Sequence, residues 1–239
     1  MKRLAPVVVL LALALALPAS AARPRLTVLA AASLTDALPR IDGRPRYSFA
    51  GSDQLAAQIR LGAPADVFLA ASPTAPRALF REGRVHRPVL FARNRLVVVV
   101  PRANRARIRT VFDLGRPGLK LVIGRAGVPI GDYTRTVLRK LELLDVLENV
   151  VSEETDVRAI LAKVALDEAD AGFVYVTDAR VATPRIRAIE LPRRGQPDVR
   201  YELAIVRSTR HLGQARAFVR RVLGPAGRRA LARAGFGLP

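Results

Sequence analysis

The chain has 239 residues, half of them hydrophobic, and it carries a formal net charge of +20 and no cysteine. This length and hydrophobic content support one sizeable core, or two smaller cores joined by a hinge, and argue against a disordered chain. The lack of cysteine excludes disulfide bonds, a cysteine nucleophile, thiolate metal sites and a lipid anchor on an acylated cysteine.

The positive charge raises the question of binding to nucleic acid or another polyanion. Arginines are scattered from Arg40 to Arg233 without one dense basic run. A nucleic-acid surface concentrates its basic residues or interleaves them with aromatic side chains. We therefore favour a solvated arginine-rich surface without nucleic-acid binding, and keep a basic polyanion-binding exported protein as a less favoured alternative.

Residues 1–22 have the layout of a secretory signal peptide. A cationic start precedes an apolar run from about Val7 to Leu17, and the small residues "ASA" follow. The apolar run is shorter than the roughly 20 residues that span a bilayer. We therefore expect a mature chain that begins near Ala22 or Arg23, is exported to the periplasm, diffuses freely and is not membrane-embedded.

Extended apolar runs alternate with helical patterns along the rest of the chain. The predicted strands are residues 25–33, 46–50, 65–71, 95–101, 119–124, 171–176 and 200–206. The predicted helices are residues 34–41, ended early by Pro39, then 53–61, closed by Gly62, 74–85, 130–144, 156–170 and a pair within 214–236. Strands that alternate with helices predict an α/β fold with mostly parallel sheets.

Two sets of these units are separated near residues 91–101 and rejoined near residues 199–206. This arrangement predicts two lobes that are linked by two crossings of the chain. We assign residues 23–92 together with residues 203–239 to lobe one, and residues 93–202 to lobe two.

Four strand-to-helix junctions carry small or hydroxyl residues, and helix N-termini at such junctions are suited to anions. The junctions contain Ser33, Ser52, Ile130 with Gly131, and residues 155–157. Taken one at a time, each is best explained as a helix cap, worth about 1 kcal/mol. Together they would suit a tetrahedral oxyanion, although their spacing does not show that they meet in space.

Six segments along nearly the whole mature chain have a pattern known from one family. They are "LTVLAAASLTDAL", "FAGSDQLAAQIRLGAPADVFLAA", "RLVVVVPRA", "VPIGDYTRTVLRKL", "EETDVRAILAKVALDEADAGFVYVTDA" and "RYELAIV". They resemble the molybdate-binding proteins of ABC transporters. The resemblance implies a type II periplasmic-binding-protein fold, with a mostly parallel sheet flanked by helices in each lobe, which closes like a hinge on one molybdate or tungstate ion.

The resemblance also implies how the protein works. It implies a monomer that delivers the ion to a membrane permease, with no enzyme activity, no cofactor and no metal besides the molybdenum of the ligand. The family's ligand contacts fall on Ser33 and Ser52 in lobe one and on Ile130, Val157 and Tyr175 in lobe two. The three hydroxyls would donate hydrogen bonds, and Ile130 and Val157 would donate through their backbone N–H groups. Without the resemblance, Tyr175 would be interpreted as a core or hinge tyrosine, because it lies in an apolar strand.

Neutral donors of this kind favour an unprotonated dianion. A hydrogen phosphate ion would leave its own O–H without an acceptor, at a cost of ~1–3 kcal/mol. Sulfate, which is also unprotonated, has to be discriminated by its smaller size. A binding protein for another oxyanion, such as sulfate or phosphate, is therefore the main alternative.

Three features depart from the family pattern. The segment between Leu38 and Arg46 is short, and Glu202 stands where a proline is common, which predicts a softer hinge. Asp53 follows Ser52 and has two interpretations. Its carboxylate either enters the pocket, where it would favour a protonated ligand, or complements the dipole of its helix for ~0.3–1 kcal/mol, and we favour the second.

An enzyme is the least favoured class. His86 and His211 lie in polar contexts without a visible nucleophile or metal-ligand spacing. A hydrolase would need one of these histidines beside Ser33 or Ser52, and their predicted loops do not suggest it.

Overall fold

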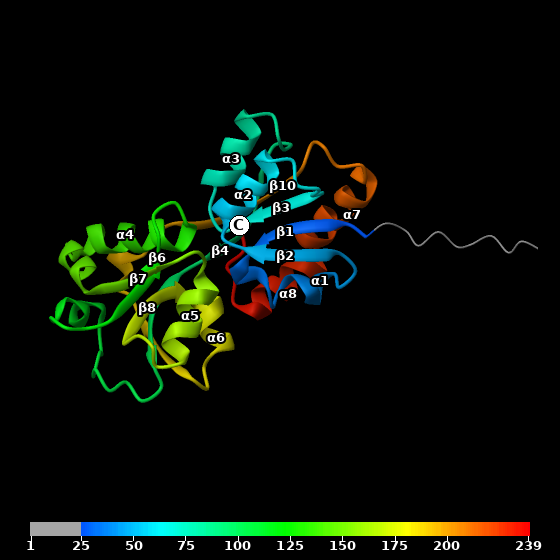
Figure 1. The fold of residues 1–239 in the computed structure, drawn as a ribbon. Coiled ribbons are helices and arrows are strands. Elements are labelled where there is room, and N and C mark those ends of the chain that lie inside the picture. The colour runs from blue at the N-terminus through cyan, green and yellow to red at the C-terminus, as the bar shows by residue number, and fades with distance from the viewer. Residues whose placement is uncertain (1–24) are drawn as a thin grey trace, which may run out of the picture.

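The computed structural model describes residues 25–239, so the predicted signal peptide at residues 1–22 lies outside the described residues. Within the described range, the chain forms two lobes side by side, each built on a five-stranded sheet with helices packed against it (Figure 1). The predicted α/β fold with two lobes is therefore confirmed. No helix in residues 25–239 is long and apolar enough to cross a membrane.

The first sheet has the strand order β2-β1-β3-β10-β4, with β1, β2 and β3 parallel and β10 antiparallel to β3 and β4. Its strands are β1 (Thr27–Ala31), β2 (Arg46–Ala50), β3 (Val67–Ala70), β4 (Val89–Asn94) and β10 (Val199–Ile205). The helical segments of this lobe are η1 (Ala32–Leu34), α1 (Leu38–Ile41), α2 (Ser52–Arg60), α3 (Thr74–Arg81), α7 (Leu212–Leu223) and α8 (Pro225–Ala234). The two C-terminal helices thus return to the lobe in which the described chain begins (Figure 1).

The second sheet has the order β7-β6-β8-β5-β9, with β6 parallel to β7 and β8, and β5 antiparallel to β8 and β9. Its strands are β5 (Leu96–Pro101), β6 (Leu121–Gly124), β7 (Val150–Glu154), β8 (Ala171–Tyr175) and β9 (Ile186–Glu190). The helical segments are η2 (Val111–Gly115), α4 (Pro129–Leu141), η3 (Leu144–Asn149), α5 (Val157–Ala165), α6 (Val176–Val181) and η4 (Arg193–Gly195).

The chain passes between the two sheets twice. It leaves the first sheet at Arg95, between β4 and β5, and returns through residues 191–198 to β10. Gln196 ties the two crossings together, because its side chain accepts from the Leu96 N–H at 3.1 Å and donates to the Leu96 carbonyl at 2.8 Å. The predicted lobe boundaries at 92/93 and 202/203 fall inside β4 and β10, both strands of the first sheet, and they stay predictions.

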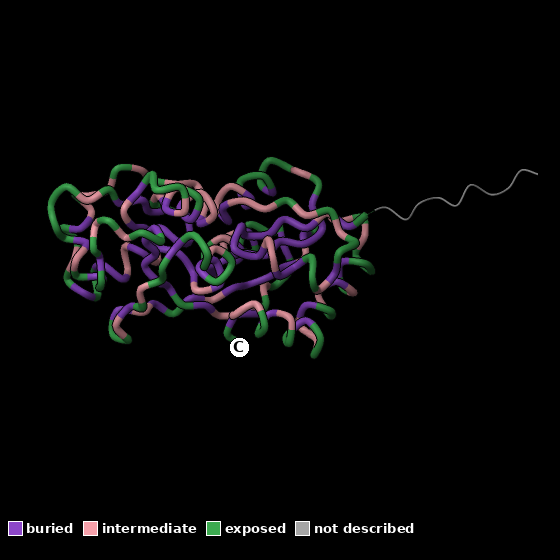
Figure 2. Tube along the Cα trace, turned by 90° about the horizontal axis from the view of Figure 1, so that it is seen from below, coloured by how far each residue is buried: buried purple, intermediate pink, exposed green. Residues whose placement is uncertain are grey.

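The central strands of each lobe are buried, and exposed residues lie on the periphery (Figure 2). Strands β3 and β5 are buried along their whole length. Helix-covered strands of this kind have continuous apolar sequences, which is why both were predicted from sequence. Strands β1, β2, β3 and β8 end toward the junction of the lobes, where Ala31, Ala50, Ala71 and Tyr175 lie around one pocket.

The structure corrects the prediction for the first helix. Pro39 was expected to end it early, but α1 begins at Leu38 with Pro39 in its first turn. Proline is well tolerated there, because the first N–H groups of a helix have no intrahelical acceptor. The helices predicted to reach residues 144 and 170 end at Leu141 and Ala165, with Glu142 in the left-handed region at φ 59°.

Candidate functional site

The four predicted junctions meet in one pocket between the lobes. All five predicted site residues, Ser33, Ser52, Ile130, Val157 and Tyr175, are among its lining residues. The space open to the centre of a water-sized sphere is about 20 Å³, which exceeds the ~10–15 Å³ that one water molecule needs. The pocket is therefore small and suits one compact ligand.

Three helices begin at this pocket. Ser52 opens α2, Ile130 lies in the first turn of α4 behind Pro129, and Val157 opens α5. The first N–H groups of a helix have no intrahelical acceptor, and they carry the positive end of the helix dipole. The backbone N–H groups of Ile130 and Val157 are thus available for an anion, whatever their side chains are.

Local sequence features hold these helix ends in place. A side chain at Gly131 would overlap the carbonyl oxygens of Gly124 and Arg125, so glycine lets α4 start directly against the end of β6. Asp156 caps α5, with its carboxylate accepting from the N–H groups of Arg158 at 2.7 Å and Ala159 at 3.1 Å. An N-cap side chain accepts from the second and third N–H groups of its helix. Val157 is the first residue of α5, so its N–H stays outside the capping contacts.

The pocket hydroxyls differ in their contacts. Ser33 Oγ lies 2.9 Å from Tyr201 Oη. Ser52 Oγ accepts from the Ala71 N–H at 3.1 Å, so the Ser52 hydrogen remains available for another acceptor. Both serines are buried, with exposed fractions of 3% and 1%.

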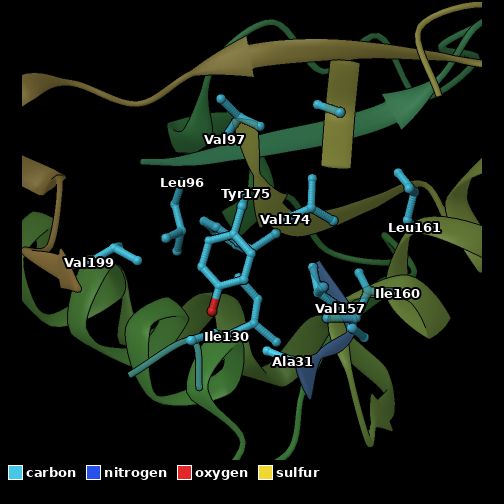
Figure 3. Packing of buried hydrophobic residues seen from close by; sticks show 14 of the residues in the cluster. Ala31, Leu96, Val97, Ile130, Val157, Ile160, Leu161, Val174, Tyr175 and Val199 are labelled. Atoms are coloured by element: carbon cyan, nitrogen blue, oxygen red, sulfur yellow. The ribbon is translucent and has the colours of Figure 1, made fainter. Parts of the chain in front are cut away.

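Tyr175 contributes a buried donor. Figure 3 shows its ring among apolar side chains such as Leu96 and Val174, with the hydroxyl pointing toward Ile130. This hydroxyl has no hydrogen-bond partner among residues 25–239. Burial raises the pKa of the Tyr175 phenol well above its usual value, so the group keeps its proton. A buried donor without an acceptor is costly unless a ligand supplies that acceptor.

The lining residues include no lysine or arginine among the part of the chain described by the structure. In the same residues, 25–239, there is no group of three or more His, Asp or Glu side chains placed to hold a metal cation. The carboxylate in the lining, Asp156, accepts from two N–H groups of its own helix through Oδ1. The other polar groups are hydroxyl and backbone donors, which suit an anion and not a bare cation. The arrangement can thus hold an oxyanion by hydrogen bonds alone.

Asp53 does not belong to the pocket lining. It lies in the first turn of α2, and its Oδ2 accepts from Arg125 Nη2 at 3.0 Å. Arg125 follows β6, so this ion pair joins the two lobes beside the pocket. The sequence interpretation placed Asp53 in the first helical turn but missed Arg125, because the two residues are 72 positions apart.

A second ion-pair group joins the lobes. Arg158 Nη2 on α5 lies 2.5 Å from Asp36 Oδ2 in lobe one, and its Nε lies 2.7 Å from Asp178 Oδ1. Gly51 of lobe one lies against the Thr155 carbonyl of lobe two, so that a Cβ on Gly51 would overlap the Thr155 oxygen. The lobes are therefore in close contact around the pocket.

The remaining singled-out residues lie elsewhere. His211 Nδ1 is 3.2 Å from Asp66 Oδ1, His86 donates its backbone N–H to the Ile205 carbonyl, and neither histidine lines the pocket. Glu202 lies within β10 and accepts from Arg77 Nη2 at 2.6 Å, which ties this strand to α3. Glu202 was expected at a soft crossing, but the structure places it inside the first sheet.

Two α/β lobes around a small pocket of neutral donors define a binding protein. The chain belongs to the family described as bacterial extracellular solute-binding protein, whose pattern matches residues 26–237. This is a family of substrate-binding proteins and not of enzymes, which confirms the expectation from the sequence.

The chain is also similar to individual proteins whose names state an oxyanion ligand. The chain is 36% identical over 224 residues to the molybdate-binding protein ModA of Mycobacterium tuberculosis, covering 90% of this chain and 85% of the relative. The periplasmic molybdate-binding protein of Azotobacter vinelandii has a similar structure, with a TM-score of 0.79 and 24% identity over 90% of this chain and all of the other. The sulfate-binding protein SubI of M. tuberculosis gives a TM-score of 0.77 at 18% identity, over 89% of this chain and 86% of the other. The two structural similarities show the fold, which does not by itself choose between oxyanions.

Proposed function

We propose that this chain is the molybdate-binding component of an ABC transporter, which captures molybdate between its lobes and delivers it to a membrane permease. The observation that carries the proposal is the pocket at which three helix N-termini and three hydroxyls converge. The 36% identity to a molybdate-binding protein over 90% of this chain supports molybdate as the ion.

In this proposal the ion contacts are those predicted from sequence. Ser33, Ser52 and Tyr175 donate through their hydroxyls, and Ile130 and Val157 donate through their backbone N–H groups. Hydrogen bonds to a charged acceptor are roughly twice as strong as those between neutral groups. A dianion therefore gains enough from several such donors to be held without an arginine or lysine in the lining.

The proposal extends to the location of the protein, its oligomeric state, its second ligand and its lobes. We propose a periplasmic monomer, exported by the signal peptide at residues 1–22, that binds tungstate as well as molybdate. We also propose that residues 23–92 with 203–239 form one lobe and residues 93–202 the other, linked by the two crossings.

The main alternative is a protein for sulfate or phosphate, since the same fold serves a sulfate-binding protein. Phosphate is disfavoured by the pocket itself. Its proton needs an acceptor, but Asp53 lies outside the lining and is paired with Arg125. The lining carboxylate, Asp156, is turned to its own helix, where its Oδ1 accepts from two backbone N–H groups. Sulfate is discriminated by size alone, so it is the closer competitor.

Thermal unfolding tests the proposal directly. A ligand that binds only the native state raises the melting temperature. We expect sodium molybdate and sodium tungstate to raise it, and sodium sulfate and phosphate at equal ionic strength to raise it much less. A rise with phosphate alone would show that the pocket accepts a protonated oxyanion, and would contradict the proposed function.

A further inference from the structure

The hydrogen of Ser33 can point in two directions, and the difference matters for an anion. Ser33 Oγ lies 2.9 Å from Tyr201 Oη, and either hydroxyl can donate in this contact. If Ser33 donates, it presents lone pairs to the pocket and repels an anion. If Tyr201 donates, Ser33 keeps its hydrogen for the ligand. The other contacts of Tyr201 decide between these arrangements.

Asn94 supplies the deciding contact. The backbone N–H of Arg95 donates to Asn94 Oδ1 at 2.9 Å. Because a backbone N–H only donates, this contact fixes which end of the amide is the oxygen. The nitrogen of Asn94 is thereby turned toward Thr177 Oγ1, at 3.0 Å, and Tyr201 Oη, at 3.4 Å.

An amide nitrogen can only donate, so the Tyr201 oxygen is the acceptor in its contact with Asn94. Among residues 25–239, the other hydrogen-bond partner of Tyr201 Oη is Ser33 Oγ at 2.9 Å, so the Tyr201 hydrogen points to Ser33. Tyr201 is fully buried, and burial raises the pKa of its phenol well above the usual value, so this hydrogen is retained. Its ring is held edge-on between Tyr175 and Phe236, at centroid distances of 5.7 and 5.4 Å.

We propose that Asn94 and Tyr201 are positioning residues that set the direction of a hydrogen-bond chain, from Arg95 N–H through Asn94 and Tyr201 to Ser33, so that Ser33 offers its hydrogen to the bound ion. The inference rests on the proposed function and deepens it. Neither residue is part of the pocket lining, yet together they make the pocket select an unprotonated oxyanion. Ser52 is oriented in the same sense by the Ala71 N–H, without such a chain.

The substitution Asn94→Asp reverses the direction of this hydrogen-bond chain. Its carboxylate still accepts from the Arg95 N–H, but its second oxygen accepts from Tyr201 instead of donating to it. The Tyr201 oxygen then accepts from Ser33, whose lone pair turns into the pocket. We expect molybdate affinity to fall by about 10- to 100-fold, because a donor has been replaced by an acceptor facing the ion. The ratio of molybdate to phosphate affinity should fall as well, since hydrogen phosphate can donate to Ser33.

The negative charge added by Asn94→Asp also acts on the bound anion through space. The control therefore removes the hydrogen-bond chain and keeps the charge. Tyr201→Phe preserves the ring and leaves Asn94 paired with Thr177. In the Tyr201→Phe background, Asn94→Asp should change the affinity ratio far less than it does in the wild type. Equal changes in the two backgrounds would overturn the inference, because charge alone would then explain the effect.

Calorimetric titration of the four proteins with sodium molybdate, sulfate and phosphate at neutral pH gives all these ratios. Wild-type protein that binds none of these ions would contradict the proposed function, and the inference with it. Wild-type protein that binds molybdate, together with an unchanged ratio in Asn94→Asp, would overturn the inference alone. If Asn94→Asp does not fold, Tyr201→Phe takes its place in the test. Without the Tyr201 hydroxyl, Ser33 is free to accept a proton from the ligand, so a molybdate-to-phosphate affinity ratio below that of the wild type supports the inference. An unchanged affinity ratio overturns it.

Discussion

Individual donors at the pocket differ in whether the side chain matters. Ser52 offers a hydroxyl whose oxygen is held by the Ala71 N–H, whereas Ile130 offers only its backbone at the start of α4. This difference explains how an isoleucine is compatible with an oxyanion site. It also predicts that substitution of Ser52 weakens ion binding more than substitution of Ile130 does.

We expect Ser52→Ala to weaken molybdate binding by about 10- to 100-fold, because one charge-assisted hydrogen bond is lost. Ile130→Val, the matched control, keeps the backbone donor and should stay within about threefold of the wild type. Calorimetric titration of both variants gives the comparison. A larger loss for Ile130→Val than for Ser52→Ala would contradict the assignment of these donors.

The buried carboxyl of Asp178 makes the stability of the folded protein depend on pH. It is fully buried, and burial raises the pKa of its carboxyl to about 6 despite the opposing charge of Arg158. The folded protein therefore holds this proton more tightly than the unfolded chain. The stabilisation is fully present below about pH 4 and is lost as the pH rises through about 6.

We expect the free energy of unfolding of the wild type, relative to that of Asp178→Asn, to fall by up to about 3 kcal/mol between pH 4 and pH 7. Comparison with this variant cancels the carboxyl groups whose pKa is lowered, such as Asp42 and Asp198, which act with the opposite sign. Denaturant unfolding of both proteins across this range provides the measurement. A difference that does not change with pH would show that Asp178 is charged at all these pH values.

The contact between the end of β2 and the segment before α5 determines how closely the lobes approach. Gly51 lies against the Thr155 carbonyl, and a Cβ there would overlap that oxygen. Gly51 has φ −58°, which alanine also adopts, so the backbone of lobe one accepts the substitution. Within lobe one the added Cβ would lie 2.7 Å from Asp53 Oδ1, the end of a side chain, whereas across the lobes it would overlap a backbone oxygen.

Gly51→Ala should therefore hinder closure. We expect molybdate affinity to fall at least about tenfold, with little change in the unfolding of the ligand-free protein. Gly213→Ala is the control, because its added methyl group meets no atom within 4 Å. Small-angle scattering should show contraction with molybdate for the control and not for Gly51→Ala. Equal contraction and affinity for both variants would contradict a role of Gly51 in closure.

At the scale of elements, the sequence predicted best where burial is continuous. Strands β3, β5 and β8 are buried throughout and have uninterrupted apolar sequences. Strands β4, β7 and β9 were missed because each contains charged residues and exposed or half-buried positions. The short helix α6 directly follows β8, where the apolar run "AGFVYV" continues into its first residue and hides the boundary.

At the scale of the whole molecule, the sequence predicted two lobes and five residues that the structure brings to one pocket. It had no signal for the contacts that join distant segments. Asp53 and Arg125 are 72 residues apart, and Asn94 and Tyr201 are 107 residues apart. Such pairs depend on tertiary packing, and local periodicity carries no information about them.

Calorimetric titration of the wild-type protein with molybdate, tungstate, sulfate and phosphate tests directly whether this chain binds molybdate. All five predicted donors line one small pocket, which predicts one ion bound per chain. We expect molybdate and tungstate to bind tightly, and sulfate and phosphate to bind much more weakly. Binding of phosphate, with no heat from molybdate or tungstate, would contradict the account.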